Sequence, residues 1–365
     1  MNFPGLDPSW RFVHSLLRAV GIIKPWTIAE CKASLAKGEK VLVVANTALG
    51  DSILCTPLLK SLSDALGSDR VGFLVRSSYV DLYQGVPWIG KVFGVQGKYR
   101  GFGDLKVQLK KEGYRIALVA NTTEPDLIPW LWWSGIRGFL RYRNRWSTWS
   151  NWFANRNQML SPESSNYATE HAIDNNLAMM ETLGIPISTH NLCYEHDDLE
   201  VKLPSFAPRY IVLHPGASRV EKRWPLENWS RIVKALRSEF SLECIITGSR
   251  EEIELASELK HQLGSDATNL AGQLSLPELA RLLRSASLFM SGDTGPYHLA
   301  VAVGCPTVTL FAPRDRGSSS EACGPHHVDL TKHVVCQTKR FHDPIMMIDM
   351  ESVGLAAYDI LKRYP

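Results

Sequence analysis

The stretch 41–53, VLVVANTALGDSI, joins an unbroken apolar run to a turn of small residues and an acidic residue. Four consecutive Val and Leu residues bounded by turn residues are typical of a strand buried on both faces. The turn that follows has the composition of a strand-to-helix connection. Asp51 lies at its end, where a carboxylate either caps the next helix or faces a ligand. These residues alone leave both interpretations open.

Similar apolar runs recur along the chain, with helix-like segments between them. The runs lie at 41–44, 71–75, 116–120, 210–214, 243–247, 288–291 and 307–311. Continuous apolar strands that alternate with helices predict parallel sheets covered by helices on both faces. The series occurs twice, and the polar segment 194–210, with its two prolines, separates the halves.

We therefore predict an α/β protein with two Rossmann-like domains that face a central cleft. The expected parts are a helical extension over 1–39, a first domain over 40–190, a second over 205–350 and a terminal helix over 351–365. The extension has apolar residues at helical spacing with basic residues between them. Such a helix packs on its own domain or lies on a membrane surface.

Composition is that of a soluble globular protein, with 45% hydrophobic and 21% charged residues. The net charge of +3 is too small to indicate a nucleic-acid-binding protein. The seven cysteines are scattered without a CxxC pair, which argues against a zinc site and a disulfide framework. Neither a long apolar span nor a signal-peptide pattern is visible, so we expect a cytoplasmic protein.

The segment 214–229, HPGASRVEKRWPLENW, places a glycine turn and three cations directly after a predicted strand. The cations are Arg219, Lys222 and Arg223. Backbone N–H groups and cations together neutralise a phosphate, so this loop is a candidate phosphate site. The alternative is a solvated loop that leads into a helix.

The segment 291–308, SGDTGPYHLAVAVGCPTV, points to the same chemistry. Asp293 and Thr294 follow a strand, and a helix opens after them with His298 in its first turn. A helix N-terminus has unpaired N–H groups and a positive dipole end, which suits a pyrophosphate. The alternative is a capping Asp beside an ordinary surface His.

Glu251 and Glu252 stand at the end of the second strand of the second domain. A carboxylate there commonly binds the hydroxyls of a ribose, although glutamates are also frequent in the first turn of any helix. Together the three segments predict a pocket for a nucleoside diphosphate. The glycine motifs of NAD enzymes and of P-loop proteins are both missing from the sequence, which points to a nucleotide sugar.

Residues 127–162 hold six of the eleven tryptophans and five arginines but no acidic residue. Guanidinium groups and indoles together suit a phosphorylated glycolipid at a membrane surface. We therefore take Arg137, Arg141 and Arg143 as candidate acceptor contacts. Two alternatives are single-stranded nucleic acid and a partly buried helix with solvated arginines.

Several of these segments resemble glycosyltransferase family 9, the ADP-heptose:lipopolysaccharide heptosyltransferases. They are VLVVANTALGDSILCTPLLKSL (41–62), HAIDNNLAMMETLGI (171–185), IVLHPGASRVEKRWPLENW (211–229) and MSGDTGPYHLAVAVGCPTVTLFAP (290–313). They occur in the family's order. The resemblance implies the GT-B fold and an inverting, metal-independent sugar transfer.

The resemblance also implies roles for single residues. Asp51 matches the family's proposed catalytic base, Lys222 matches a lysine that binds the donor phosphates, and Glu252 matches the glutamate on the ribose. The other expected donor contacts are Ser218, Asp293, Thr294, Gly295 and His298. The expected acceptor contacts, besides the three arginines, are Thr47 and Gly50. One departure is plain, because Ala45-Asn46 stands where family members often have an arginine.

The leading hypothesis is transfer of heptose from ADP-heptose to a lipopolysaccharide core, with Asp51 and Lys222 as catalytic residues. One alternative is transfer of another nucleotide-linked sugar to a different glycan or glycolipid. A second is a non-catalytic protein that binds nucleotide sugars. We expect no metal, no cofactor and no nucleic-acid partner, and a cytoplasmic location that includes peripheral attachment to the inner face of the cytoplasmic membrane.

Overall fold

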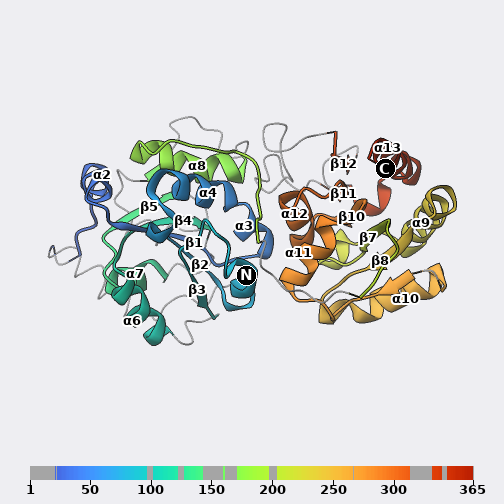
Figure 1. Cartoon of the computed structure of the whole chain (residues 1–365), viewed down its shortest axis with the longest axis horizontal. Helices are drawn as coiled ribbons and strands as arrows, with labels where there is room; N and C mark the ends of the chain where they lie inside the picture. Colours follow the sequence, from blue (N-terminus) through green and yellow to red (C-terminus); the bar gives the residue numbers. More distant parts are fainter. Residues whose placement is uncertain are drawn as a thin grey trace. The chain divides into compact units, whose positions relative to one another are not determined.

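The protein is represented by a computed structural model that describes most of the chain. The described residues are 21, 23–96, 102–121, 127–142, 159–160, 171–196, 204–265, 267–312, 331–338 and 343–364. They divide into two compact units (Figure 1). Unit 1 holds the described residues up to 160 together with Ala172–His190, and unit 2 holds residue 171 and those from 191 onward. Residues 1–20 of the predicted helical extension (1–39) lie outside the described part.

The sheet of unit 1 is entirely parallel. Its strands are β1 (Lys40–Ala45), β2 (Val71–Arg76), β3 (Lys91–Val95), β4 (Tyr114–Asn121), β5 (Gly138–Tyr142) and β6 (Met159–Leu160). The spatial order is β3-β2-β1-β4-β5-β6. The order therefore reverses between β1 and β4, as in Rossmann-type sheets.

Helices cover both faces of this sheet. They are α2 (Ile28–Ala36), α3 (Leu49–Ile53), α4 (Thr56–Leu66), α5 (Val80–Tyr83), α6 (Phe102–Glu112), α7 (Leu127–Trp133) and α8 (Ala172–Leu183). Figure 1 shows α4 and α8 over one face, with α6 and α7 over the other. Leu42 and Val44 pack with Leu109 and Leu131 on the α6 and α7 side. Burial on both faces explains why β1 is apolar throughout its centre.

The sheet of unit 2 repeats the same arrangement. Its strands are β7 (Tyr210–His214), β8 (Glu243–Ile246), β9 (Ala267–Asn269), β10 (Leu288–Gly292), β11 (Thr307–Phe311) and β12 (His333–Gln337). All pairs are parallel, and the order is β12-β11-β10-β7-β8-β9. Counted from its first strand, this is the order of unit 1, with the reversal between β7 and β10.

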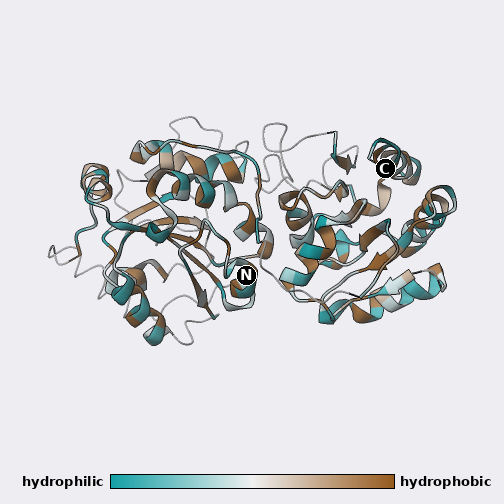
Figure 2. Ribbon diagram, viewed as in Figure 1, coloured by the Kyte–Doolittle hydropathy of each residue, from teal (hydrophilic) through white to brown (hydrophobic). Residues whose placement is uncertain are grey.

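The helices of unit 2 bury a separate core. They are α9 (Leu226–Phe240), α10 (Ile253–Leu263), α11 (Leu276–Arg284), α12 (Gly295–Ala302) and α13 (Met350–Arg363). Residues of α9, α10 and α13 pack against β7, β8, β10 and β11. Figure 2 shows the strands as hydrophobic and the outer helix surfaces as mixed, as expected for amphipathic helices on a buried sheet. Within the described residues, no helix is long and apolar enough to cross a membrane.

The prediction of two parallel sheets covered by helices is confirmed. Each of the seven predicted strands exists, within a few residues of its predicted ends. Five strands were not predicted, namely β3, β5, β6, β9 and β12. They lie toward the edges of the sheets and are short or carry polar residues, so their apolar pattern is weak. One of them, β5, lies within the basic, tryptophan-rich segment 127–162.

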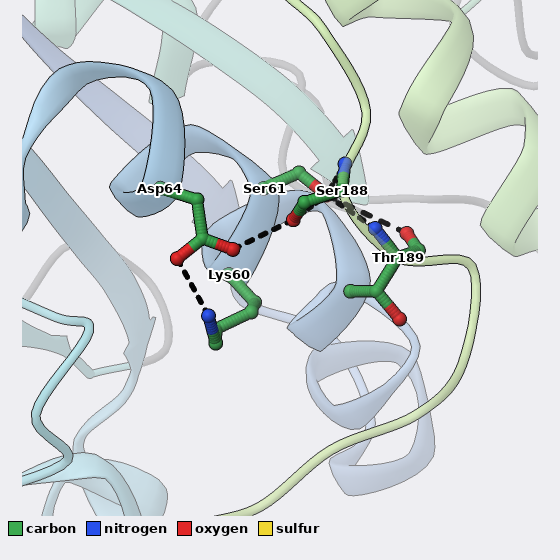
Figure 3. A network of polar contacts seen from close by, with 5 residues as sticks. All are labelled: Lys60, Ser61, Asp64, Ser188 and Thr189. Atoms are coloured by element: carbon green, nitrogen blue, oxygen red, sulfur yellow. Dashed lines mark hydrogen bonds and ion pairs between the residues drawn. The ribbon is translucent and has the colours of Figure 1, made fainter.

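A polar network ties α4 to the segment where the chain leaves unit 1 (Figure 3). The hydroxyl oxygen of Ser61 accepts hydrogen bonds from the backbone N–H groups of Ser188, at 3.1 Å, and Thr189, at 3.3 Å. The Ser188 hydroxyl donates to Asp64, which also pairs with Lys60 at 2.5 Å. Because Ser61 is fully buried, these N–H groups have no ready replacement in water.

We expect Ser61→Ala to lower the free energy of unfolding by about 1–3 kcal/mol, because it removes a buried acceptor of two backbone hydrogen bonds. Urea denaturation measures the change. The matched control is Ser63→Ala on the same helix, whose hydroxyl makes no hydrogen bond within the described residues. The control should change the free energy by less than about 0.5 kcal/mol. Equal effects of the two substitutions would contradict this role for Ser61.

Candidate functional site

The candidate residues follow the carboxyl ends of the central strands in both units. In an open parallel sheet, ligands bind outside these ends where the strand order reverses, because the crossover connections leave that place uncovered. In unit 2, Lys222 follows β7 and Asp293 follows β10, the two strands that flank the reversal. In unit 1, Asp51 follows β1, which also flanks a reversal.

Asp51 is both a helix cap and a half-exposed carboxylate. It is the third residue of α3, and its Oδ2 accepts hydrogen bonds from the Thr47 hydroxyl at 2.5 Å and the Ala48 N–H at 3.1 Å. Among the described residues, no hydrogen bond engages Oδ1. One oxygen therefore fixes the carboxylate and the other is available to a ligand, so the two interpretations of Asp51 are compatible.

Buried residues and a hydrogen bond from α8 also hold the turn around Asp51. Gly50 and Thr47 are buried in the turn between β1 and α3. Asn176 of α8 donates from its side-chain amide to the carbonyl of Leu54, at 3.2 Å, just past the end of α3. The segment HAIDNNLAMMETLGI thus contributes a buried side chain that holds the helix of Asp51 in place.

In unit 2 a short ion pair links the two loops at the reversal. Lys222 Nζ lies 2.6 Å from Asp293 Oδ2, and the two side chains are 30% and 15% exposed. Partial burial keeps this pair less screened than a surface pair. Gly292 allows the loops to approach, because a Cβ at that position would lie 3.2 Å from the Lys222 carbonyl oxygen.

The loop that carries Lys222 is held by its neighbours in the sequence. Trp224 is buried and packs edge-to-face on Trp229 of α9, with ring centroids 4.8 Å apart. The Arg223 guanidinium donates to the carbonyl of Ala217, at 3.2 Å and 3.3 Å. The two interpretations of this segment are therefore compatible, because the cationic loop leads directly into the helix that starts after Trp224-Pro225. Ser218 lies exposed in the same loop.

The N-terminus of α12 lies beside this ion pair. Thr294 is the N-cap, but its side chain makes no capping hydrogen bond, and its buried Oγ1 has no partner within the described residues. Gly295 begins the helix and His298 lies buried in its first turn, 4% exposed. A buried hydroxyl without a partner next to unpaired helix N–H groups is an arrangement that a phosphate would satisfy.

Glu252 is buried at the end of β8, the strand next to β7. It is 8% exposed, and its Oε2 accepts a hydrogen bond from the Ser249 N–H at 2.8 Å and lies 3.7 Å from His214 Nε2. A Cβ added to Gly216 would overlap the Glu252 carboxylate, so the glycine of the HPG turn makes room for it. Glu251, by contrast, is exposed.

A cavity of about 600 Å³ adjoins the Lys222–Asp293 pair. Its wall also includes Asp343, Leu310 and Ile345. The last two are apolar, and the carboxylate of Asp343 adds a polar group to the wall. The sequence did not predict these three residues or a role for His214, and no local pattern around Asp343 links it to residue 222. Gly216 belongs to the predicted glycine turn of the segment 214–229.

The three predicted acceptor arginines do not lie together in one site. Arg137 precedes β5, at the edge opposite the carboxyl ends, where it lies 4.2 Å from the Trp132 ring centroid and donates to the Trp132 carbonyl. This position favours a structural role over an acceptor contact. Arg141 lies within β5 and is 3% exposed, and burial lowers the pKa of its guanidinium to about 10. Arg143 lies outside the described residues.

Comparison with known families identifies the chain. A family model described as glycosyltransferase family 9 (heptosyltransferase) matches residues 103–341, more than half of the 365 residues. The chain belongs to glycosyltransferase family 9. The match includes Lys222, Glu252 and Asp293, while Asp51 precedes it. The family assignment makes the protein a glycosyltransferase, as the resemblance of its motifs implied.

Curated relatives are lipopolysaccharide heptosyltransferases. The chain is 24% identical over 287 residues to lipopolysaccharide heptosyltransferase 3 of Escherichia coli K12, covering 73% of this chain and 80% of that protein. It is 23% identical over 286 residues to lipopolysaccharide core heptosyltransferase OpsX of Haemophilus influenzae, covering 75% and 79%. At these identities the chain shares the family with its relatives.

Solved structures confirm the fold. A family 9 glycosyltransferase from Veillonella parvula matches with a TM-score of 0.72 at 18% identity, covering 89% of this chain and 97% of that one. The E. coli heptosyltransferase WaaC, solved with ADP, matches with a TM-score of 0.68 at 19% identity, covering 88% and 99%. The expected GT-B type α/β fold is therefore confirmed.

The His214–Glu252 contact predicts a pH dependence of stability. Burial lowers the pKa of His214, and the Glu252 carboxylate opposes part of that shift. Unfolded His214 binds a proton near pH 6.5 and folded His214 only at lower pH, so the free energy of unfolding falls as the pH drops below about 6.5. We expect this fall, measured by urea denaturation from about pH 7 to about pH 5, to be smaller in His214→Gln.

The matched control is His261→Gln, because His261 is exposed on α10. It should leave the pH dependence as it is in the wild type. A dependence in His214→Gln as steep as that of the wild type would contradict burial of a neutral His214.

Proposed function

We propose that this family 9 glycosyltransferase moves heptose from ADP-heptose to a lipopolysaccharide core acceptor, with inversion at the anomeric carbon and without a metal ion. The observation that carries the proposal is the Lys222–Asp293 pair beside the unpartnered Thr294 hydroxyl at the N-terminus of α12. The names of the relatives support heptose and lipopolysaccharide as the substrates.

In the proposed complex, unit 2 binds the donor. The diphosphate lies at the N-terminus of α12, where the Thr294 hydroxyl and the Gly295 N–H donate to its oxygens and Lys222 neutralises its charge. Asp293 holds Lys222 in position before the donor arrives. Glu252 accepts hydrogen bonds from the ribose hydroxyls. When the sugar–phosphate bond breaks, these same donors stabilise the charge that grows on the departing ADP.

Unit 1 supplies the base. Thr47 and Ala48 hold Oδ2 of Asp51, which leaves Oδ1 to take the proton of an acceptor hydroxyl. That oxygen forms the new bond to the anomeric carbon as the bond to ADP breaks, and the electron pair of the broken bond stays on the phosphate oxygen. Attack opposite the leaving group inverts the anomeric configuration. Lys222 and the helix N–H groups neutralise the charge on the departing diphosphate, as a bound metal ion does in other glycosyltransferases.

We also propose that the reaction takes place in the cytoplasm at the inner face of the cytoplasmic membrane. A nucleotide sugar is water-soluble, whereas a lipopolysaccharide core is attached to a lipid, so the enzyme needs access to both phases. The arginines and tryptophans of residues 127–162 support peripheral attachment by their composition. Arg143, Arg145 and Arg156 lie outside the described residues, as do Trp146, Trp149 and Trp152.

We expect Asp51→Asn to lower kcat for transfer about 10²–10⁴-fold, because the amide cannot accept the acceptor proton. The affinity for ADP, measured by calorimetry, should stay unchanged. The control is Asp81→Asn in the same unit, whose side chain is exposed. Full activity in Asp51→Asn would remove Asp51 as the base, and lost ADP binding would assign it to the donor site.

The donor is tested by measuring Tm with ADP, UDP, GDP, CDP and their sugars, once in EDTA and once in Mg²⁺. We expect ADP and ADP-heptose to raise Tm, and Lys222→Met to abolish the rise because the diphosphate loses its cation. A rise with another nucleotide alone would replace the donor in the proposal. A rise that needs Mg²⁺ would contradict metal independence, and no rise with any nucleotide would contradict the donor site itself.

A further inference from the structure

An arginine that the predicted acceptor site did not include lies at the start of the turn that carries Asp51. Strand β2 pairs with β1 in parallel, and the pairing of Ala45 with Val75 places Arg76 beside Asn46 at the carboxyl ends of both strands. The Arg76 Nε donates to the backbone carbonyl of Asn46 at 3.1 Å. The residue is exposed at the end of an otherwise buried strand. This contact and a side-chain hydrogen bond with Tyr79 hold the guanidinium at the place where β1 leads into the Asp51 turn.

A second polar residue near this place is Tyr79. It lies in the 3-10 turn Ser77–Tyr79 that follows β2. Burial and the Asp51 carboxylate raise the pKa of its phenol, while the Arg76 guanidinium and the Leu49 backbone N–H lower it. Tyr79 thus lies three residues beyond Arg76 at the carboxyl end of β2 and shares a side-chain hydrogen bond with it. A cation, a hydroxyl and the proposed base therefore gather at the ends of two adjacent strands.

The Arg76 charge has no carboxylate partner among the described residues at ion-pair distance. A guanidinium has five N–H donors, and the Asn46 carbonyl uses the one on Nε. Tyr79 takes another, and the donors that these two contacts leave open lie in one plane and suit a phosphate or carboxylate group. The position directly after β1 cannot supply such a charge in this chain, because Ala45 and Asn46 are uncharged and buried.

We propose that Arg76, together with Tyr79, binds an anionic group of the acceptor, a phosphate or a carboxylate, and so presents the acceptor hydroxyl to Asp51. This inference rests on the proposed function and adds to it the chemical class of group that the acceptor must carry. It makes Arg76 a substrate-binding residue that determines which acceptors are used.

The test measures heptose transfer from ADP-heptose to an inner-core glycolipid by wild type, Arg76→Gln and the control Lys111→Gln. Lys111 is an exposed cation on α6. Three forms of the acceptor are used: intact, dephosphorylated with hydrofluoric acid, and carboxyl-reduced. We expect Arg76→Gln to raise KM for the intact acceptor about tenfold or more, with KM for ADP-heptose unchanged. Lys111→Gln should behave as the wild type.

The modified acceptors identify the anion. On the acceptor that lacks the group bound by Arg76, wild type and Arg76→Gln should have the same KM, because the contact is lost in both. Equality on the dephosphorylated form assigns a phosphate, and equality on the carboxyl-reduced form assigns a carboxylate. An unchanged KM for the intact acceptor would overturn the proposal. So would the same rise in KM on all three acceptors, since that pattern belongs to a residue that only supports the Asp51 turn.

A second measurement separates this inference from the proposed function. If the wild type transfers no heptose, anion binding is measured without turnover, as the rise in Tm caused by inorganic phosphate in the presence of saturating ADP. We expect a larger rise in wild type than in Arg76→Gln, and equal rises would overturn the inference. Saturating ADP restricts the comparison to anions outside the donor site.

Discussion

The reversal of strand order at the centre of each sheet is the constraint on which the sites depend. Crossovers that run in opposite directions from the two central strands leave the carboxyl ends of those strands uncovered, with loops of both strands side by side. In unit 2 this brings Lys222 within 2.6 Å of Asp293, although 71 residues separate them. In unit 1 the same geometry leaves Asp51 at the end of β1 with one carboxylate oxygen available.

Each site uses groups that also hold the backbone. Asp51 caps its own helix with one oxygen, and Glu252 caps another through the Ser249 N–H. Fixing a carboxylate in this way orders it before any ligand arrives, so less entropy is lost on binding. Thr294 is the exception, because its buried hydroxyl has no partner within the described residues. That hydroxyl is therefore available to a ligand at the N-terminus of α12, as the proposed function requires.

Much of the fold could be predicted because central strands are buried on both faces and so read as apolar runs, as in β1 and β7. Edge strands such as β9 lack that burial and were missed. The motifs placed Asp51, Lys222 and Asp293 correctly at strand ends. Arg76 could not be linked to Asp51 from the sequence, since their proximity comes from the pairing of β2 with β1. Arg137, read only from composition, lies at the opposite edge of its sheet.

The nucleotide of the donor is proposed to bind where the strand order of unit 2 reverses. Hydrogen–deuterium exchange of the full chain with and without ADP can locate it, because bound phosphates protect the N–H groups that they engage. We expect slower exchange in peptides that cover 215–223, 248–254 and 292–299, and little change in the strands of unit 1. Protection confined to unit 1, or exchange that ADP leaves unchanged throughout unit 2, would contradict it.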